Sequence, residues 1–307
     1  MSQATQARKS GSVRGIVLLI VVVLAWGTVW PVNKALLAYM PPVWSIALRS
    51  WISMLTLFAI SLAVTGLAAP RLHDTPVLVS MVVLHMVGFT ILSTLALQVV
   101  PAGQSTVLAY TSVLWAPIGA ALFLRERLSR ARAIGLSLGV IGLVVIFNPL
   151  SFDWSDHNAV LGNGALLCAA LLWAASIVHN RGHTWHATPF QLAPWQALLA
   201  ALLLTGAAVW LEGLPAIVWT QESVLMLLFA GIPGTALAYW AAAVSSSELP
   251  ASTTSLGLLG APAVSVVVAQ WLLGEEPGVA LIVALALIFL GVCIGILGSG
   301  GEAAGRR

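Results

Sequence analysis

Residues Ala25–Leu36 read AWGTVWPVNKAL, and a related stretch, LWAASIVHNRGH, begins 147 positions later at residue 172. Trp26 and Asn33 of the first stretch correspond to Trp173 and Asn180 of the second. Further anchors follow in the same order, the later ones at an offset of 149: Gly15, Pro42, Gly66, Pro101, Glu126 and Gly142 recur as Gly162, Pro189, Gly213, Pro250, Glu275 and Gly291. Ordered matches over the whole chain indicate an internal duplication.

The composition places this duplicated chain in a membrane. Of its 307 residues, 60% are hydrophobic and only 7% are charged, whereas soluble domains carry about 25% charged residues. The first apolar run follows a basic start, but it extends for about twenty residues, longer than a signal-peptide core, and no small-residue cleavage site follows it. We therefore expect that run to be a retained helix of an all-α integral membrane protein.

Cutting the sequence at charges, prolines and turn residues predicts ten spans of the length that a bilayer requires. They are Gly15–Leu36, Val43–Thr65, Val77–Gln98, Ala102–Leu124, Ala131–Phe147, Val160–Val178, Phe190–Leu211, Val224–Val244, Ala251–Leu273 and Val279–Leu297. With the N-terminus inside, the inner segments hold 11 of the 13 lysines and arginines, and the outer loops hold acidic residues instead. The positive-inside rule therefore predicts that both termini are cytoplasmic.

Each half, residues 1–149 and 150–307, contains five of the predicted helices. Because five is odd, the second copy must enter the membrane upside down. Inverted repeats of this kind are typical of transporters whose substrate site lies near the midplane. The alternative is that the duplication only enlarged a helical bundle.

The end of each repeat carries a further pattern, PA…LxxxE. It reads PAGQSTVLAYTSVLWAPIGAALFLRE from Pro101 and PASTTSLGLLGAPAVSVVVAQWLLGE from Pro250. Together with the five-helix repeat and the tryptophan in each first helix, this pattern resembles the drug/metabolite transporter superfamily, in its EamA-type, ten-helix branch. The resemblance implies export of amino acids and related metabolites across the bacterial inner membrane, as in YddG-like exporters. The first helix lacks the acidic residue of small multidrug-resistance relatives, which argues against cationic drugs.

Two cations break the apolar runs. Lys34 lies near the predicted outer end of the first helix, and its repeat partner Arg181 lies near the inner end of the sixth. They could form the two mouths of one pathway for a carboxylate, or their side chains could snorkel to the headgroups. Arg49 lies about 9 Å inside the second helix at 1.5 Å per residue, and Gln196 replaces it in the second half. Its guanidinium fits a substrate carboxylate, although a lipid phosphate is the alternative partner.

His85 falls near the centre of the third predicted helix. It could couple transport to protons, or it could be a neutral ring that is hydrogen-bonded to a backbone carbonyl. The histidine-rich stretch from Arg181 to His186 has no matching cluster elsewhere in the sequence. We therefore predict no metal site.

Aromatic residues inside the spans suggest a cavity that suits a partly apolar zwitterion, although lipid-facing packing can explain any one tryptophan. The predicted pathway residues are Trp26, Asn33, Lys34, Arg49, His85, Tyr110, Trp115, Trp173, Asn180, Trp195 and Tyr239. Pro117 and Pro262 are expected to interrupt the fourth and ninth helices. Paired GxxxG motifs, at Gly135 and Gly291, predict close helix contact within a monomer or between the subunits of a homodimer.

The chain has no GxxxxGK[ST] motif for ATP and no catalytic motif of a membrane-embedded enzyme. We therefore predict no enzymatic activity and no cofactor. The basic residues gather at the predicted membrane edges, so we also predict no nucleic-acid partner. The predicted function is a secondary transporter or facilitator that exports neutral amino acids, aromatic ones included, and related metabolites by alternating access. The alternatives are export of quaternary amines, nucleosides or other metabolites, then an intramembrane enzyme, a channel or a membrane scaffold.

Overall fold

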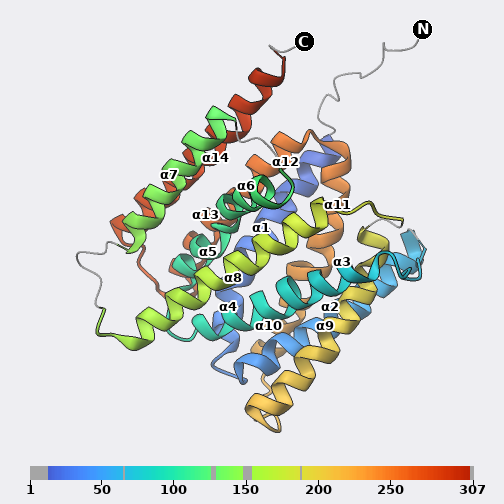
Figure 1. Ribbon diagram of the computed structural model, residues 1–307. Coiled ribbons are helices and arrows are strands. Elements are labelled where there is room, and N and C mark those ends of the chain that lie inside the picture. Colours follow the sequence, from blue (N-terminus) through green and yellow to red (C-terminus); the bar gives the residue numbers. More distant parts are fainter. Residues whose placement is uncertain (1–12, 65, 126–128, 148–153, 187–188, 305–307) are drawn as a thin grey trace.

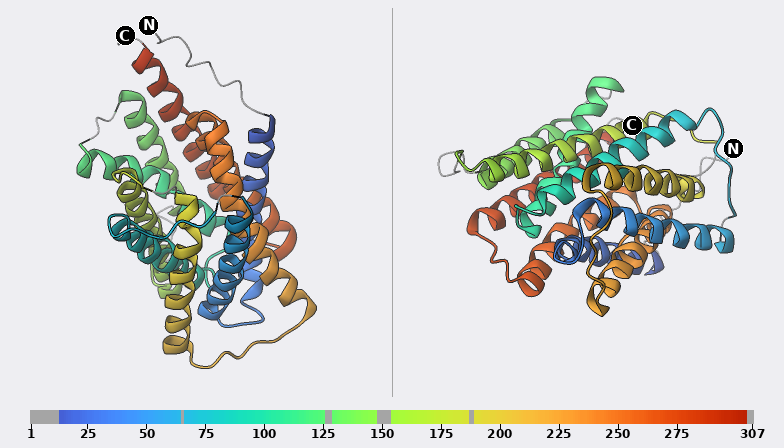
Figure 2. Two further views of the ribbon diagram at one scale, coloured as in Figure 1. Left: turned by 90° about the vertical axis from the view of Figure 1, so that its right-hand side faces the viewer. Right: turned by 90° about the horizontal axis from the view of Figure 1, so that it is seen from below.

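The computed structural model describes residues 13–64, 66–125, 129–147, 154–186 and 189–304. Within these residues every element of regular secondary structure is a helix, and no strand is present. The helices pack into one bundle, and the start of α1 and the end of α14 lie at the same end of it (Figures 1 and 2).

Most of the helices follow the predicted spans, and several predicted spans are divided into consecutive segments. In chain order they are α1 (Val13–Leu36), α2 (Pro42–Val64), α3 (Thr75–Ser80), η1 (Met81–Phe89), α4 (Thr90–Ala96), α5 (Ala102–Tyr110), α6 (Ser112–Phe123), α7 (Arg130–Phe147), α8 (His157–Arg181), α9 (Pro189–Glu212), α10 (Gln221–Gly231), η2 (Ile232–Leu237), α11 (Ala238–Glu248), α12 (Ala251–Leu258), α13 (Gly260–Leu273) and α14 (Val279–Ala304).

Eight of the described helical runs are long and apolar enough to cross a membrane. Two further apolar stretches, Ala133–Ile146 in α7 and Val279–Gly295 in α14, are shorter. The count of ten spans therefore stays a prediction.

The fourth and ninth predicted helices are interrupted upstream of their prolines. α5 gives way to α6 at Thr111, and α12 gives way to α13 at Leu259, whereas α6 continues through Pro117 and α13 through Pro262. The breaks lie three residues before Pro262 and six residues before Pro117, so the assignment of both interruptions to these prolines stays a prediction. Proline is tolerated in the first turn of a helix, where its missing N–H would lack a partner in any case. Pro262, the third residue of α13, occupies such a position.

Two pairs of corresponding helices from the two halves pack antiparallel. Between α2 and α9, the backbone N–H of Trp44 donates to Glu212 at 3.0 Å, and Trp51 Nε1 donates to Thr205 Oγ1 at 2.9 Å. Between α7 and α14, a β-carbon added at Gly135 would overlap the carbonyl oxygen of Gly291. The two GxxxG motifs thus contact each other within one chain, a choice that the sequence analysis left open.

The two halves share one core rather than folding separately. α1 packs against α13, α11 and α5, so the first helix of the chain lies mainly among helices of the second half. The main buried cluster likewise joins Trp30 and Leu36 of α1 to Leu166 of α8 and Leu227 of α10. This interleaving leaves a space in the middle of the bundle, and that space is the candidate site.

Candidate functional site

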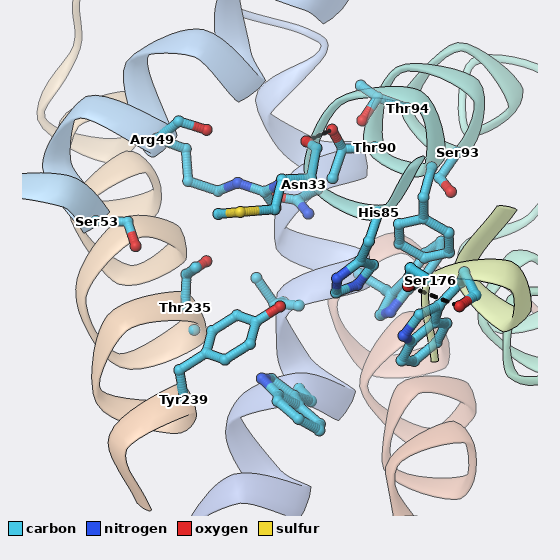
Figure 3. A pocket seen from close by; sticks show the side chains of 18 of the residues that line it. Asn33, Arg49, Ser53, His85, Thr90, Ser93, Thr94, Ser176, Thr235 and Tyr239 are labelled. Atoms are coloured by element: carbon cyan, nitrogen blue, oxygen red, sulfur yellow. Dashed lines mark hydrogen bonds between the residues drawn. The ribbon is translucent and has the colours of Figure 1, made fainter. Parts of the chain in front are cut away.

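A cavity of about 310 Å³ lies between the two halves, and its walls come from α1, α2, η1, α4, α5, α8, α9, η2 and α11. Figure 3 shows Arg49, His85 and Tyr239 directed into it from different walls. Eight of the predicted pathway residues line this cavity: Trp26, Asn33, Arg49, His85, Tyr110, Trp173, Asn180 and Tyr239.

The repeated Trp–Asn pairs lie on the two helices that begin each half. Trp26 and Asn33 line the cavity from α1, and Trp173 and Asn180 line it from α8. The spacing of seven residues returns a helix to nearly the same face after two turns. The same face therefore meets the cavity in both copies.

Arg49 brings a charge into the cavity wall. Among the described residues, its guanidinium forms no hydrogen bond or ion pair. The lining contains no aspartate or glutamate among those residues. A cation away from bulk water requires a partner, so this cavity is suited to a ligand that carries an anionic group.

His85 belongs to an aromatic wall rather than to a hydrogen-bond network. Its ring stacks on Trp173 with centroids 5.2 Å apart and planes within 7°. Phe89 and Tyr110 contact the same tryptophan at 5.1 and 5.5 Å. In the described part of the chain no hydrogen bond to the His85 ring is found, so the predicted alternative of a carbonyl-bonded histidine is wrong. The reason is that the ring faces the cavity and a neighbouring aromatic face.

Another wall of the cavity carries a hydroxyl group. Tyr239 of α11 meets Trp26 edge-on with centroids 5.9 Å apart, and Figure 3 shows its hydroxyl pointing into the cavity. The cavity therefore has aromatic rings on two sides and a guanidinium on a third.

Small hydroxyl residues complete the lining, and the sequence analysis did not select them. Ser53 and Ser93 line the cavity, and their hydroxyl groups are buried without a hydrogen-bond partner among the described residues. Buried polar groups are normally paired, so these two hydroxyl groups in the cavity wall are candidates to contact a polar ligand. Serine is common inside membrane helices, and for this reason the sequence held no signal that distinguished these two.

Two π-helical segments, η1 and η2, occupy corresponding places in the halves and both reach the cavity. η1 contributes His85 and Phe89, and η2 contributes Thr235. Thr235 Oγ1 donates to the carbonyl of Ala230 at 2.8 Å, and Thr90 Oγ1 donates to that of Met86. Such wider turns occur frequently at functional sites.

The remaining predicted pathway residues lie outside the cavity. Lys34 Nζ is 2.8 Å from Glu275 Oε1 and donates to the carbonyl of Val100 at 2.9 Å. The same carboxylate accepts the backbone N–H of Ala102 at 2.7 Å, at the start of α5. Glu275 lies in the connection between α13 and α14, and through it Lys34 links α1 to the start of α5.

Trp115 and Trp195 also lie away from the cavity. Trp115 lines a separate apolar pocket between α6 and α8, and its Nε1 donates to Thr111 Oγ1 at 3.3 Å. Trp195 packs edge-on against Phe58, and its Nε1 donates to the carbonyl of Ala68 at 2.9 Å. Both indoles fill space between helices.

A second polar cluster lies at the opposite end of the bundle from Glu275. It joins His73 and Asp74, before α3, to His183 and His186, after α8. The hydrogen bond with His183 holds the pKa of Asp74 below its ordinary value. The premise that the histidine-rich stretch has no matching cluster is therefore wrong, because the fold brings together residues 109 positions apart.

The sequence of this chain is similar to those of several known transporters. The chain is 27% identical to the "Uncharacterized transporter YvbV" of Bacillus subtilis, over 92% of this chain and 91% of the relative. It is 28% identical to a "Probable amino-acid metabolite efflux pump" of Salmonella typhimurium, over 92% and 94%. A "Riboflavin transporter" of Rhizobium johnstonii is 34% identical, over 47% of this chain and 46% of its own.

One solved crystal structure superposes with a TM-score of 0.68 at 22% identity, and it covers 93% of this chain and 99% of its own. At that identity the likeness shows the fold alone. The model of the EamA-like transporter family matches residues 13–148 and again residues 160–297. With eight helices of membrane-spanning length, the chain is a multi-pass membrane protein that belongs to the EamA-like transporter family.

Proposed function

We propose that this protein is a secondary transporter or facilitator that exports amino acids and related small metabolites across the bacterial inner membrane by alternating access. The observation that carries the proposal is the central cavity, where the guanidinium of Arg49, which has no partner among the described residues, faces aromatic walls. A zwitterionic amino acid has the complementary groups: a carboxylate for Arg49 and an apolar side chain for the rings of Trp173 and His85.

The size of the cavity favours a small substrate. Pockets for drug-sized ligands measure about 300–1,000 Å³, and the cavity, at about 310 Å³, lies at the lower limit. Amino-acid-sized molecules therefore fit better than riboflavin, which a partial relative is named for. The name of the Salmonella typhimurium relative supports the amino-acid class.

The charge of the cavity argues against quaternary amines, the main alternative. Arg49 would repel a permanent cation, and the described lining holds no carboxylate to attract one. Nucleosides carry no anionic group either, so they would leave Arg49 without a partner.

For the mechanism we propose two inverted five-helix repeats, residues 1–149 and 150–307, that form ten spans with both termini cytoplasmic. The antiparallel packing of α2 on α9 and of α7 on α14 supports the inversion. So does a pair of related contacts: Gly135 meets Gly291, and their repeat counterparts Ala284 and Gly142 meet each other. Rocking of one repeat against the other would expose the cavity to each side in turn.

Within this mechanism we assign Arg49 to the substrate carboxylate and Asn33 and Asn180 to polar contacts near the two ends of the cavity. Ser53 and Ser93 would accept or donate hydrogen bonds to the substrate ammonium or carboxylate. The Lys34–Glu275 pair would hold one end of the bundle closed, and it would have to separate or move when that end opens.

The test is counterflow with the purified protein in liposomes. Vesicles loaded with an unlabelled amino acid should accumulate the labelled form, whereas vesicles tested with riboflavin, nucleosides or tetraethylammonium should not. Exchange of the quaternary amine alone would overturn the proposed substrate class. If none of the four kinds of compound (amino acid, riboflavin, nucleoside and tetraethylammonium) showed counterflow, the transport proposal for these substrates would be overturned.

A further inference from the structure

The second polar cluster, formed by His73, Asp74, His183 and His186, has the composition of a metal site. Asp74 Oδ1 lies 2.9 Å from His183 Nε2 and 3.6 Å from His186 Nδ1. The His73 ring stacks on His183 with centroids 4.8 Å apart and meets His186 edge-on at 4.6 Å. Three imidazoles therefore surround one carboxylate.

The carboxylate itself is incompletely satisfied. Asp74 is fully buried, and its Oδ2 has no hydrogen-bond partner among the described residues. A buried carboxylate oxygen without a partner is costly. The neighbouring imidazoles reach Oδ1 only. A cation bound at the carboxylate would remove this deficit.

We propose that this cluster binds one divalent first-row transition-metal ion of the Zn²⁺ class. Imidazole nitrogens with one carboxylate are a ligand set that Zn²⁺ accepts, whereas Ca²⁺ and Mg²⁺ prefer oxygen ligands. The ligand atoms of His73, Asp74 and His183 all lie within 4.8 Å of one another.

The cluster must contract to close around an ion. At Zn–N and Zn–O distances of about 2.0–2.2 Å and tetrahedral angles, two ligand atoms on one ion lie about 3.4 Å apart. The ligand atoms of His73, Asp74 and His183 lie within 4.8 Å of one another, so the widest of these separations must shorten by up to about 1.4 Å. His73 is exposed, so rotation of its side chain can supply that movement without disturbing the packed helices.

The position of the site gives the ion a structural role. His73 and Asp74 precede α3, and His183 and His186 follow α8, so one ion would tie together two connections that belong to different halves of the chain. Trp185 lies edge-on to His183 at 5.0 Å, and its Nε1 donates to Asn180 Oδ1 at 2.9 Å. Asn180 lines the central cavity. Bound metal would therefore hold that end of the bundle in one arrangement.

The binding test uses Zn²⁺ alone and the full-length protein purified without a polyhistidine tag. Isothermal titration should show one ion per chain. His183→Gln and His73→Gln should each weaken binding at least about tenfold, as losses in a metal site commonly do. His157→Gln is the matched control, because His157 is an exposed histidine at the start of α8, outside the cluster. It should bind as the unaltered protein does.

His73→Gln keeps the test independent of folding, because the exposed side chain can be replaced without opening the core. Saturating Zn²⁺ should raise the thermal unfolding temperature of the unaltered protein and of His157→Gln, and this rise should be lost in His183→Gln. The proposal is overturned if the unaltered protein shows no saturable binding, or if both cluster variants bind as tightly as the control. These readouts do not involve transport, so their outcome is separate from that of the proposed function.

Discussion

α1 and α8 begin the two halves of the chain, and each places a tryptophan and an asparagine at the central cavity. α2 and α9 follow them and differ at the position where charge occurs. Arg49 of α2 lines the cavity. Its counterpart Gln196 of α9 is buried, and its amide contacts the sulfur of Met81 at 3.7 Å. The duplicated framework builds the hollow, and one departure from the duplication places a charged side chain in its wall.

The largest effect on substrate affinity is expected when α2 is made to resemble α9 at this position. Arg49→Gln removes the guanidinium, and we expect the affinity for an amino-acid substrate to fall about 30-fold or more, since loss of a charged partner costs about 2 kcal/mol or more. Substrate competition in the counterflow assay measures this change. Arg71→Gln, at an exposed connection, carries the same change of net charge and should transport normally. Equal affinity in the two variants would contradict the role of Arg49.

Trp26 and Trp173 correspond to each other in the repeat, but they contact different numbers of aromatic rings. Trp173 meets His85, Phe89 and Tyr110, whereas Trp26 meets Tyr239. Aromatic pairs contribute about 0.5–1.5 kcal/mol each. We expect Trp173→Leu to lower the free energy of unfolding by about 1–3 kcal/mol more than Trp26→Leu does.

Unfolding of each tryptophan variant in detergent, followed by circular dichroism, gives this difference. Equal losses would mean that the rings around Trp173 adjust to fill the space that the indole leaves.

α7 and α14 approach each other closely at two glycines of α7, and the two contacts differ in how tight they are. A methyl group at Gly135 would overlap the carbonyl of Gly291, whereas a methyl group at Gly142 would lie 3.0 Å from the carbonyl of Ala284. We expect Gly135→Ala to destabilise the protein by about 1–3 kcal/mol, and Gly142→Ala to cost less.

Gly164→Ala on α8 is the control for the two glycine variants. A β-carbon there meets no other atom within 4 Å, and alanine favours a helix over glycine. Thermal unfolding of the three variants in one detergent should rank them with Gly135→Ala lowest. If another variant had the lowest unfolding temperature, the closest contact between these helices would not be at Gly135.

The smallest expected effect concerns Lys34 and Arg181, which correspond to each other in the repeat. The Lys34–Glu275 pair is partly exposed, with 26% and 17% of the side-chain surfaces accessible. Lys34→Gln should therefore cost about 1 kcal/mol of unfolding free energy. Glu276→Gln, beside it and exposed, should cost nothing measurable.

If the symmetry extends to this contact, Arg181→Gln should lose a similar amount of stability, by the same measurement. The counterpart of Glu275 is Glu126, which lies outside the described residues. A loss from Lys34→Gln alone would restrict the ion pair to one end of the bundle.

The sequence by itself determined the membrane class, the family and the duplication, and it selected most of the charged and aromatic cavity residues. The physical reason is that polar and aromatic groups inside apolar helices are few, so Trp26, Arg49 and His85 are visible against their surroundings. The recurrence of Trp26 as Trp173 drew attention to the first helix of each half, and its failure at Arg49 drew attention to the second helix.

Only the tertiary structure decided which neutral side chains complete the cavity and which charges are paired within the protein. Ser53 and Ser93 resemble many other serines in the chain until the helices pack around them. The π-helical segments η1 and η2 depend on backbone hydrogen bonds that no residue type specifies. Lys34 meets Glu275, and Asp74 meets His183, only because the chain folds back on itself. Contacts between distant residues depend on packing, and hydropathy and spacing along one helix do not encode them.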